Sequence, residues 1–147
     1  MKTRLLTIAA VGLFLAAAAP KEDDAKKELE KWQGTWTLVG AEEKGQKLSD
    51  EELKKGPVTL IVKGDKFTLK LPDQTMEGTF KIDPDKKPKA YDAKGTDAEG
   101  KTHESKGIYE IEGDMLKVCF VSADKERPKE FKADAGSDSL IHTYKKK

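Results

Sequence analysis

One stretch of the sequence matches a nucleotide-binding motif letter for letter. Residues 95–102, Gly-Thr-Asp-Ala-Glu-Gly-Lys-Thr, fit the phosphate-binding pattern G-x-x-x-x-G-K-T. A working loop of this kind follows a buried strand and opens a helix, whose first N–H groups hold the phosphates. Here a strand pattern follows from Ser105, and Asp97 and Glu99 would place negative charge against the phosphates. The stretch therefore predicts a glycine-rich hairpin loop.

The other residues that could do chemistry show no pattern typical of a site. His103 lies in that loop and His142 lies near the C-terminus, without the spacing of zinc ligands. The acidic residues between positions 83 and 99 lack the spacing of a calcium loop, which favours a solvated acidic surface. Ser137 and Ser139 lie near His142 in sequence, but that proximity does not orient a nucleophile toward a base. We expect no metal, no cofactor and no enzymatic activity.

Charge and cysteine content narrow the class of partner. The 28 basic and 27 acidic residues are interspersed along the chain, so no basic face is expected for nucleic acid or an anionic membrane. Cys119 is the only cysteine, so an internal disulfide is excluded. It lies in the apolar run 115–121, which predicts a buried, unreactive thiol; an intermolecular bridge is the alternative. A monomer is expected.

The first 19 residues have the three parts of a secretory signal peptide. Lys2 and Arg4 supply positive charge, residues 5–15 are almost entirely apolar, and residues 16–19 are alanines suited to cleavage. The apolar stretch is shorter than the roughly 20 residues of a spanning helix, although an uncleaved anchor is the alternative. We expect a protein exported to the periplasm or the extracellular space. Residues 20–147 would then form a single domain with no stable membrane insertion.

The hydrophobic pattern after the signal peptide is that of one short helix followed by strands. Residues 21–33 predict a helix, with Leu29 and Trp32 on one face and Gly34 ending it. A brief helical turn is expected at residues 49–55. From residue 35 the period is mostly two, and it predicts eight strands: 35–43, 58–63, 66–71, 76–83, 89–96, 105–112, 115–121 and 139–145.

These strands predict an all-β fold. Gly64-Asp65 and Gly113-Asp114 mark two tight hairpins, and no helix is long enough for a crossover between parallel strands. An open sheet of this length would leave exposed edges, so the sheet should close on itself. The sequence therefore predicts an antiparallel up-and-down barrel of about eight strands with a short N-terminal helix.

Several short runs resemble a family of small domains found in planctomycete bacteria, over residues 29–145. That resemblance implies a lipocalin-like barrel, commonly exported, and it brings no established activity, substrate or catalytic residue. The runs that carry it are Gln33-Gly34-Thr35-Trp36, Glu51-Glu52-Leu53-Lys54, Gly64-Asp65-Lys66-Phe67, Gly78-Thr79-Phe80, Lys86-Lys87-Pro88-Lys89, Gly107-Ile108-Tyr109, Cys119-Phe120 and Arg127-Pro128-Lys129-Glu130-Phe131.

Gly34-Thr35-Trp36 also resembles the Gly-x-Trp signature of lipocalins, in which the tryptophan closes the bottom of an eight-stranded barrel. The lipocalin pattern has an arginine stacked on that tryptophan from the last strand, where this chain has only lysines, 145–147. Arg127 is the only arginine after Arg4. A structural role is expected for it, because the guanidinium suits stacking or two fixed hydrogen bonds. Our hypothesis is that Arg127 reaches across Trp36 or Trp32; an exposed loop arginine is the alternative.

Two functions remain compatible with this barrel. The first is a carrier of a small hydrophobic ligand, because an eight-stranded barrel either is filled by its own side chains or holds one small molecule. The second is a protein-interaction or inhibitor module with a filled barrel, which binds a protein partner through residues 122–138, including Arg127, Phe131 and Lys132. The inward residues expected to form the ligand site are Trp36, Leu38, Leu60, Phe67, Leu69, Phe80, Tyr91, Tyr109, Leu116, Val118 and Phe120.

Overall fold

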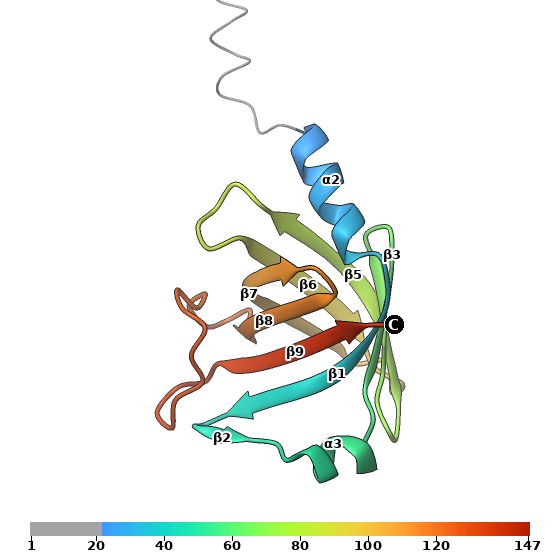
Figure 1. Cartoon of the computed structure of the whole chain (residues 1–147), viewed down its shortest axis with the longest axis vertical. Coiled ribbons are helices and arrows are strands. Elements are labelled where there is room, and N and C mark those ends of the chain that lie inside the picture. The colour runs from blue at the N-terminus through green and yellow to red at the C-terminus, as the bar shows by residue number, and fades with distance from the viewer. Residues whose placement is uncertain (1–21) are drawn as a thin grey trace, which may run out of the picture.

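The computed structural model describes residues 22–147, so the predicted signal peptide lies outside the described residues (Figure 1). Two short helices and nine strands make up residues 22–147. In order they are α2 (Glu22–Trp32), β1 (Gly34–Glu43), β2 (Gln46–Lys47), α3 (Asp50–Lys55), β3 (Thr59–Lys63), β4 (Lys66–Lys70), β5 (Thr75–Asp83), β6 (Ala90–Thr96), β7 (Thr102–Glu112), β8 (Met115–Ser122) and β9 (Leu140–Lys146).

The sheet closes between its first and last strands. Neighbouring strands pair antiparallel in the order β1, β3, β4 and on to β9, and β1 also pairs with β9. This closing register runs from Trp36 opposite Lys146 to Glu43 opposite Leu140. The two-residue β2 only extends the end of β1. The prediction of an antiparallel up-and-down barrel of about eight strands, with a short helix before the first, is confirmed.

Local signals in the sequence explain most element boundaries. The hydroxyl of Ser49 accepts a hydrogen bond from the Glu52 amide at 3.2 Å and so begins α3 where the capping pattern predicts it. Gly64 and Gly113 have φ values of 61° and 58°, as the first position of a two-residue hairpin turn requires. Backbone conformations of this kind are local, and sequence therefore predicts them well.

Apart from shifts of one residue at element ends, the structure differs from the prediction in two places. The strand β2 was not expected, because two exposed polar residues carry no alternation of hydrophobicity. The strand β7 begins at Thr102 and not at Ser105, since Thr102, His103 and Glu104 pair with Thr96, Gly95 and Lys94. The side chains at these positions are polar and give no alternating hydrophobic pattern, so the sequence does not predict a strand there. The backbone hydrogen bonds of the sheet nevertheless continue through them.

One end of the barrel is closed by α2, and we call it the sealed end. The Trp32 ring packs against Phe80 and Tyr109, with centroids 5.0 and 4.8 Å apart. The indole N–H of Trp36, a residue with no exposed surface, donates to the carbonyl of Trp32 at 2.8 Å. The Gln33 side chain donates to the Gly64 carbonyl at 3.0 Å and accepts from the Gly64 amide at 2.6 Å. These contacts hold the helix against the strand ends (Figure 1).

The opposite end, which we call the open end, is formed by the β4–β5 and β6–β7 turns and by the loop of residues 123–139. This loop leaves β8 and returns into β9 (Figure 1), and its side chains pack on the outward side of β7, β8 and β9. Phe131 packs there on a second, smaller apolar cluster that contains Ile108, Cys119 and Ile141. The Ala133 carbonyl accepts a hydrogen bond from the Gly45 amide at 2.5 Å. The loop is therefore fastened to the barrel wall.

Cys119 lies in this outer cluster and has no exposed surface. Its thiol donates to the carbonyls of Glu130 and Lys132 at 3.5 and 3.6 Å, and burial raises its pKa. No disulfide involves Cys119 within residues 22–147. The expectation of a buried thiol is confirmed.

Candidate functional site

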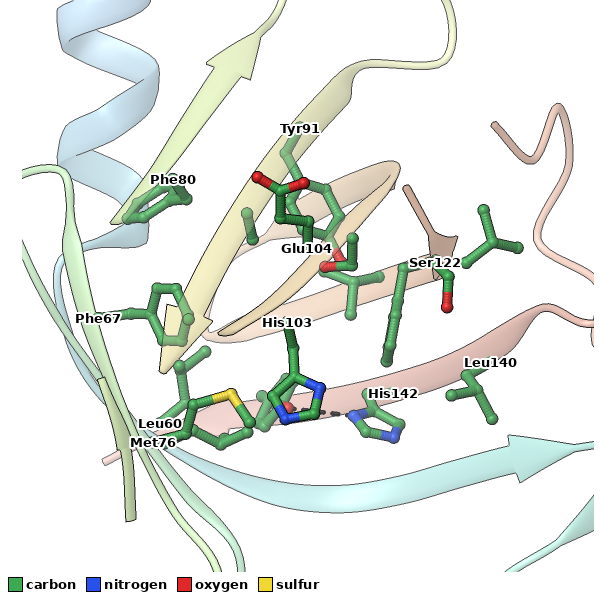
Figure 2. Close-up of a pocket in the computed structure, with 18 of the residues that line it drawn as sticks. Leu60, Phe67, Met76, Phe80, Tyr91, His103, Glu104, Ser122, Leu140 and His142 are labelled. Atoms are coloured by element: carbon green, nitrogen blue, oxygen red, sulfur yellow. Dashed lines mark hydrogen bonds between the residues drawn. The ribbon is translucent and has the colours of Figure 1, made fainter. Parts of the chain in front are cut away.

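The interior of the barrel contains a cavity of about 370 Å³ that reaches the open end (Figure 2). The value lies within the range of about 300–1,000 Å³ typical of small-molecule sites. Most of the wall is aliphatic or aromatic, and polar side chains are few. The lining residues are Trp32, Leu60, Val62, Phe67, Leu69, Met76, Phe80, Tyr91, Ala93, Gly95, His103, Glu104, Ser105, Val118, Phe120, Val121, Ser122, Asp138, Leu140, His142 and Tyr144.

The eleven residues expected to line a ligand site form two groups in the structure, those that line the cavity and those that do not. Seven of them line the cavity: Leu60, Phe67, Leu69, Phe80, Tyr91, Val118 and Phe120. The other four belong to the core cluster and do not line the cavity. These are Trp36, Leu38, Tyr109 and Leu116, each at most 8% exposed.

Small inward residues explain why the open end is hollow. Ala93, Gly95, Ser105 and Ser122 all line the cavity and carry little or no side chain. A Cβ atom at Gly95 would lie 2.9 Å from the Met76 sulfur and 3.1 Å from the Phe67 ring, so these two side chains occupy the space that glycine leaves. A barrel whose inward residues are large at one end and small at the other cannot be filled evenly.

Sequence reasoning missed the polar lining residues His103, His142 and Tyr144. Alternation along the strands was a usable signal. His142 and Tyr144 follow Leu140 at intervals of two on β9, and His103 precedes Ser105 by two on β7. The two histidines were left out because the list was built on apolar and aromatic residues.

A histidine–tyrosine pair is the main polar feature inside the cavity. Nδ1 of His142 and the hydroxyl of Tyr144 are 3.2 Å apart, and Figure 2 marks this hydrogen bond. The Phe120 ring lies edge-on to the imidazole, with centroids 5.1 Å apart. Burial lowers the pKa of His142 to about 4, and it raises the pKa of the Tyr144 hydroxyl. Both side chains are therefore uncharged at neutral pH.

His103 lies at the mouth of the cavity and is already engaged. Its Nε2 is 2.9 Å from a carboxylate oxygen of Asp97, whose other oxygen accepts from the amides of Glu99 and Lys101 at 2.9 and 3.0 Å. The hydrogen bond from His103 and the two backbone amides lower the pKa of Asp97. The amides of Glu99 and Lys101 are thus already bound by the Asp97 carboxylate. The predicted hairpin loop is confirmed, because β6 and β7 pair up to Thr96 opposite Thr102.

Arg127 does not reach either tryptophan, and that hypothesis is wrong. One guanidinium nitrogen donates to the carbonyls of Tyr91 and Gly107 at 2.8 and 2.9 Å, and the other lies 2.7 Å from Asp92. The cation over the Trp36 ring is Lys146, whose ammonium nitrogen is 4.9 Å from the ring centroid. The register of β9 against β1 places Lys146 directly opposite Trp36, so a lysine takes this position. Arg127 instead fastens the 123–139 loop to β6 and β7.

The sealed end contains the buried ionic and polar groups. Both carboxylate oxygens of Glu28 lie 3.0 Å from the ammonium of Lys89, and Glu28 is only 7% exposed. Within residues 22–147, the Trp32 indole nitrogen and the Tyr109 hydroxyl have no hydrogen-bond partner. Burial, and next the charge of Glu28, raise the pKa of Tyr109. These groups belong to the packing of α2, away from the mouth of the cavity.

The part of the chain that the structure describes contains no group of three or more His, Cys, Asp or Glu side chains placed to hold a metal ion. None of the helices in residues 22–147 has the length and hydropathy needed to cross a membrane.

No model of a known protein family matches the chain, and no curated protein matches it either.

Proposed function

We propose that this protein is an exported, non-catalytic binding protein that holds a small apolar ligand inside its barrel. The observation that carries the proposal is the largely apolar cavity of about 370 Å³ inside a closed barrel. Burying a ligand against such a wall is favourable because apolar surface leaves water. The preformed space adds no cost of rearranging the protein.

The proposed export rests on the signal-peptide pattern of residues 1–19 and on the resemblance to the exported planctomycete domains. Fractionation of cells that express the full chain tests it. The mature mass should appear outside the cytoplasm, and deletion of residues 2–19 should keep the protein inside. Equal cytoplasmic retention of both forms would contradict export.

Native mass spectrometry of the protein purified from its own organism tests ligand binding. The expected result is a reproducible extra mass of a few hundred daltons that is lost on denaturation. An Ala93→Trp variant should lose this mass, because Ala93 lines the cavity and the indole would fill it. Lys94→Trp, at the next position, faces outward and serves as the matched control. A bare polypeptide mass, with no uptake of added lipids or pigments, would contradict the proposal.

The alternative, a protein-interaction module that uses the 122–138 loop, has less support. Arg127 and Phe131, two of the three residues of that loop expected to contact a partner, are turned to the barrel and fasten the loop there. Lys132 remains exposed, with an ion pair to Glu130 at 3.0 Å. The cavity is therefore the stronger basis for a function.

A further inference from the structure

The hydrogen-bonding state of the cavity restricts the chemistry of its ligand. The hydroxyl of Tyr144 belongs to a residue that is 4% exposed, and within residues 22–147 its only hydrogen-bond partner is Nδ1 of His142. A buried hydroxyl that donates to nothing costs about 1–3 kcal/mol. Tyr144 therefore donates to Nδ1, and the single proton of the neutral imidazole lies on Nε2.

Nε2–H of His142 is consequently a donor without an acceptor. No residue between 22 and 147 accepts a hydrogen bond from it. His142 lines the cavity, and Figure 2 shows its ring among the lining side chains. By contrast His103, the other histidine of the wall, has its Nε2 bonded to Asp97. Within residues 22–147, Nε2–H of His142 is thus a free donor in a cavity wall that is mostly apolar.

The charges around the cavity do not favour an anion. No lysine or arginine is among the described lining residues, whereas Glu104 and Asp138 lie at the mouth. A carboxylate placed inside would lose its water and gain only one hydrogen bond from an uncharged imidazole. The burial that lowers the pKa of His142 disfavours any charge in this region. An uncharged acceptor avoids this cost.

We propose that the ligand is an uncharged, largely apolar molecule with one carbonyl-type acceptor, which takes its hydrogen bond from Nε2–H of His142. This inference rests on the proposed ligand-binding function. The aromatic side chains of Trp32, Phe67, Phe80 and Phe120 in the wall make planar, ring-containing molecules suitable probes.

Calorimetric titration of the mature protein at pH 7.5 with three probes of one shape tests the inference. The probes are 2-acetylnaphthalene, which has a ketone; 2-ethylnaphthalene, which lacks the oxygen; and 2-naphthoate, which is anionic. We expect the ketone to bind tightest and the anion weakest. In His142→Phe the ratio of ketone to hydrocarbon affinity should fall by about fivefold or more, the equivalent of one net hydrogen bond.

Two further variants and one spectrum complete the test. Tyr144→Phe, which frees the imidazole proton to move to Nδ1, should lower the same ratio by a smaller factor. Thr143→Val, on the outward side of β9, should leave it unchanged. In wild-type protein, ¹⁵N NMR of the histidine side chains should show a proton on Nε2 of His142 that shifts with the ketone only. This measurement needs no variant, so a His142→Phe protein that fails to fold would not prevent the test.

The outcomes separate this inference from the function it rests on. If both neutral probes bind and the ratio is the same in His142→Phe, the assignment to Nε2 is wrong and the ligand-binding function stands. Tightest binding of 2-naphthoate would overturn the uncharged class. If no probe binds and purified native protein carries no extra mass, the ligand-binding function itself fails.

Discussion

The two ends of this barrel are built from the same antiparallel strands, but side chains fill the interior at one end and leave a cavity at the other. At the sealed end Trp32, Trp36 and Tyr109 fill the interior, and the indole N–H of Trp36 donates to the Trp32 carbonyl at the end of α2. At the open end the small residues Ala93, Ser105 and Ser122 leave space in the interior, and the His142 imidazole lines it. Inward and outward residues alternate along the strands of both ends. Side-chain size along the barrel axis, and not the fold, therefore separates the part that stabilises the protein from the part that can hold a ligand.

The largest effect on stability should come from removing a buried aromatic side chain at the sealed end. Trp36→Ala should lower the free energy of unfolding by about 4 kcal/mol, because it removes a fully buried ring and its bond to the Trp32 carbonyl. Phe120→Ala at the open end should cost about 2 kcal/mol, since its ring already borders a cavity. Urea unfolding measures both. Equal losses would remove the distinction between the two ends.

The pH dependence of the free energy of unfolding should report on His142 at the open end. Burial lowers the pKa of His142 from 6.5 to about 4, so between these values the unfolded chain binds a proton that the folded chain does not. Stability should therefore decrease as the pH falls from 6.5 through 4, by about 3 kcal/mol from this residue. Tyr144, the titratable group in contact with the imidazole, stays neutral throughout, because burial raises its pKa.

The control for this titration is His142→Phe, which should lose that part of the pH dependence and keep the part due to carboxylates. Urea midpoints at pH 7 and pH 4 for both proteins measure the difference. An identical slope for both proteins would show that the imidazole is solvated.

The ion pair of the sealed end should give the next largest effect. Lys89→Met leaves the buried Glu28 carboxylate with Lys31 only, 3.6 Å away, and should destabilise the protein by about 2 kcal/mol, a value reduced because Lys89 is 40% exposed. Lys94→Met breaks the pair with Glu104, whose side chains are 63% and 57% exposed, and should change nothing measurable. Adding Glu28→Gln to Lys89→Met should restore part of the loss. Thermal unfolding compares the four proteins, and a smaller effect at Lys89 than at Lys94 would be inconsistent with a buried pair.

The smallest effect should come from the loop fastened near the open end. Arg127→Lys keeps the charge but cannot reach both backbone carbonyls and Asp92 together, so we expect a loss of about 1 kcal/mol. Hydrogen exchange should rise in residues 123–139 and stay constant in α2. Faster exchange in α2 would instead connect Arg127 to the sealed end, as the sequence had suggested.

Much of the candidate site could be read from the sequence, and the omissions have physical causes. Seven of the eleven expected lining residues were found because alternation along a strand reports which side chains face inward. Trp36, Leu38, Tyr109 and Leu116 also face inward, but the helix α2 and the neighbouring strand ends pack around them. Arg127 was assigned to the wrong contact because the path of a loop through space depends on every element it crosses.

The sequence by itself determined the strands, most of their turns, the antiparallel class and the inward face of each strand. These depend on residues within a few positions of one another: period two, a glycine at positive φ, a serine that begins a helix. Only the tertiary structure decided that β9 pairs with β1 in a register that places Lys146 against Trp36, and that a cavity remains where small residues meet. Strand register and stagger bring together residues far apart in the chain. The volume between them is therefore a property of the whole barrel, which no local pattern encodes.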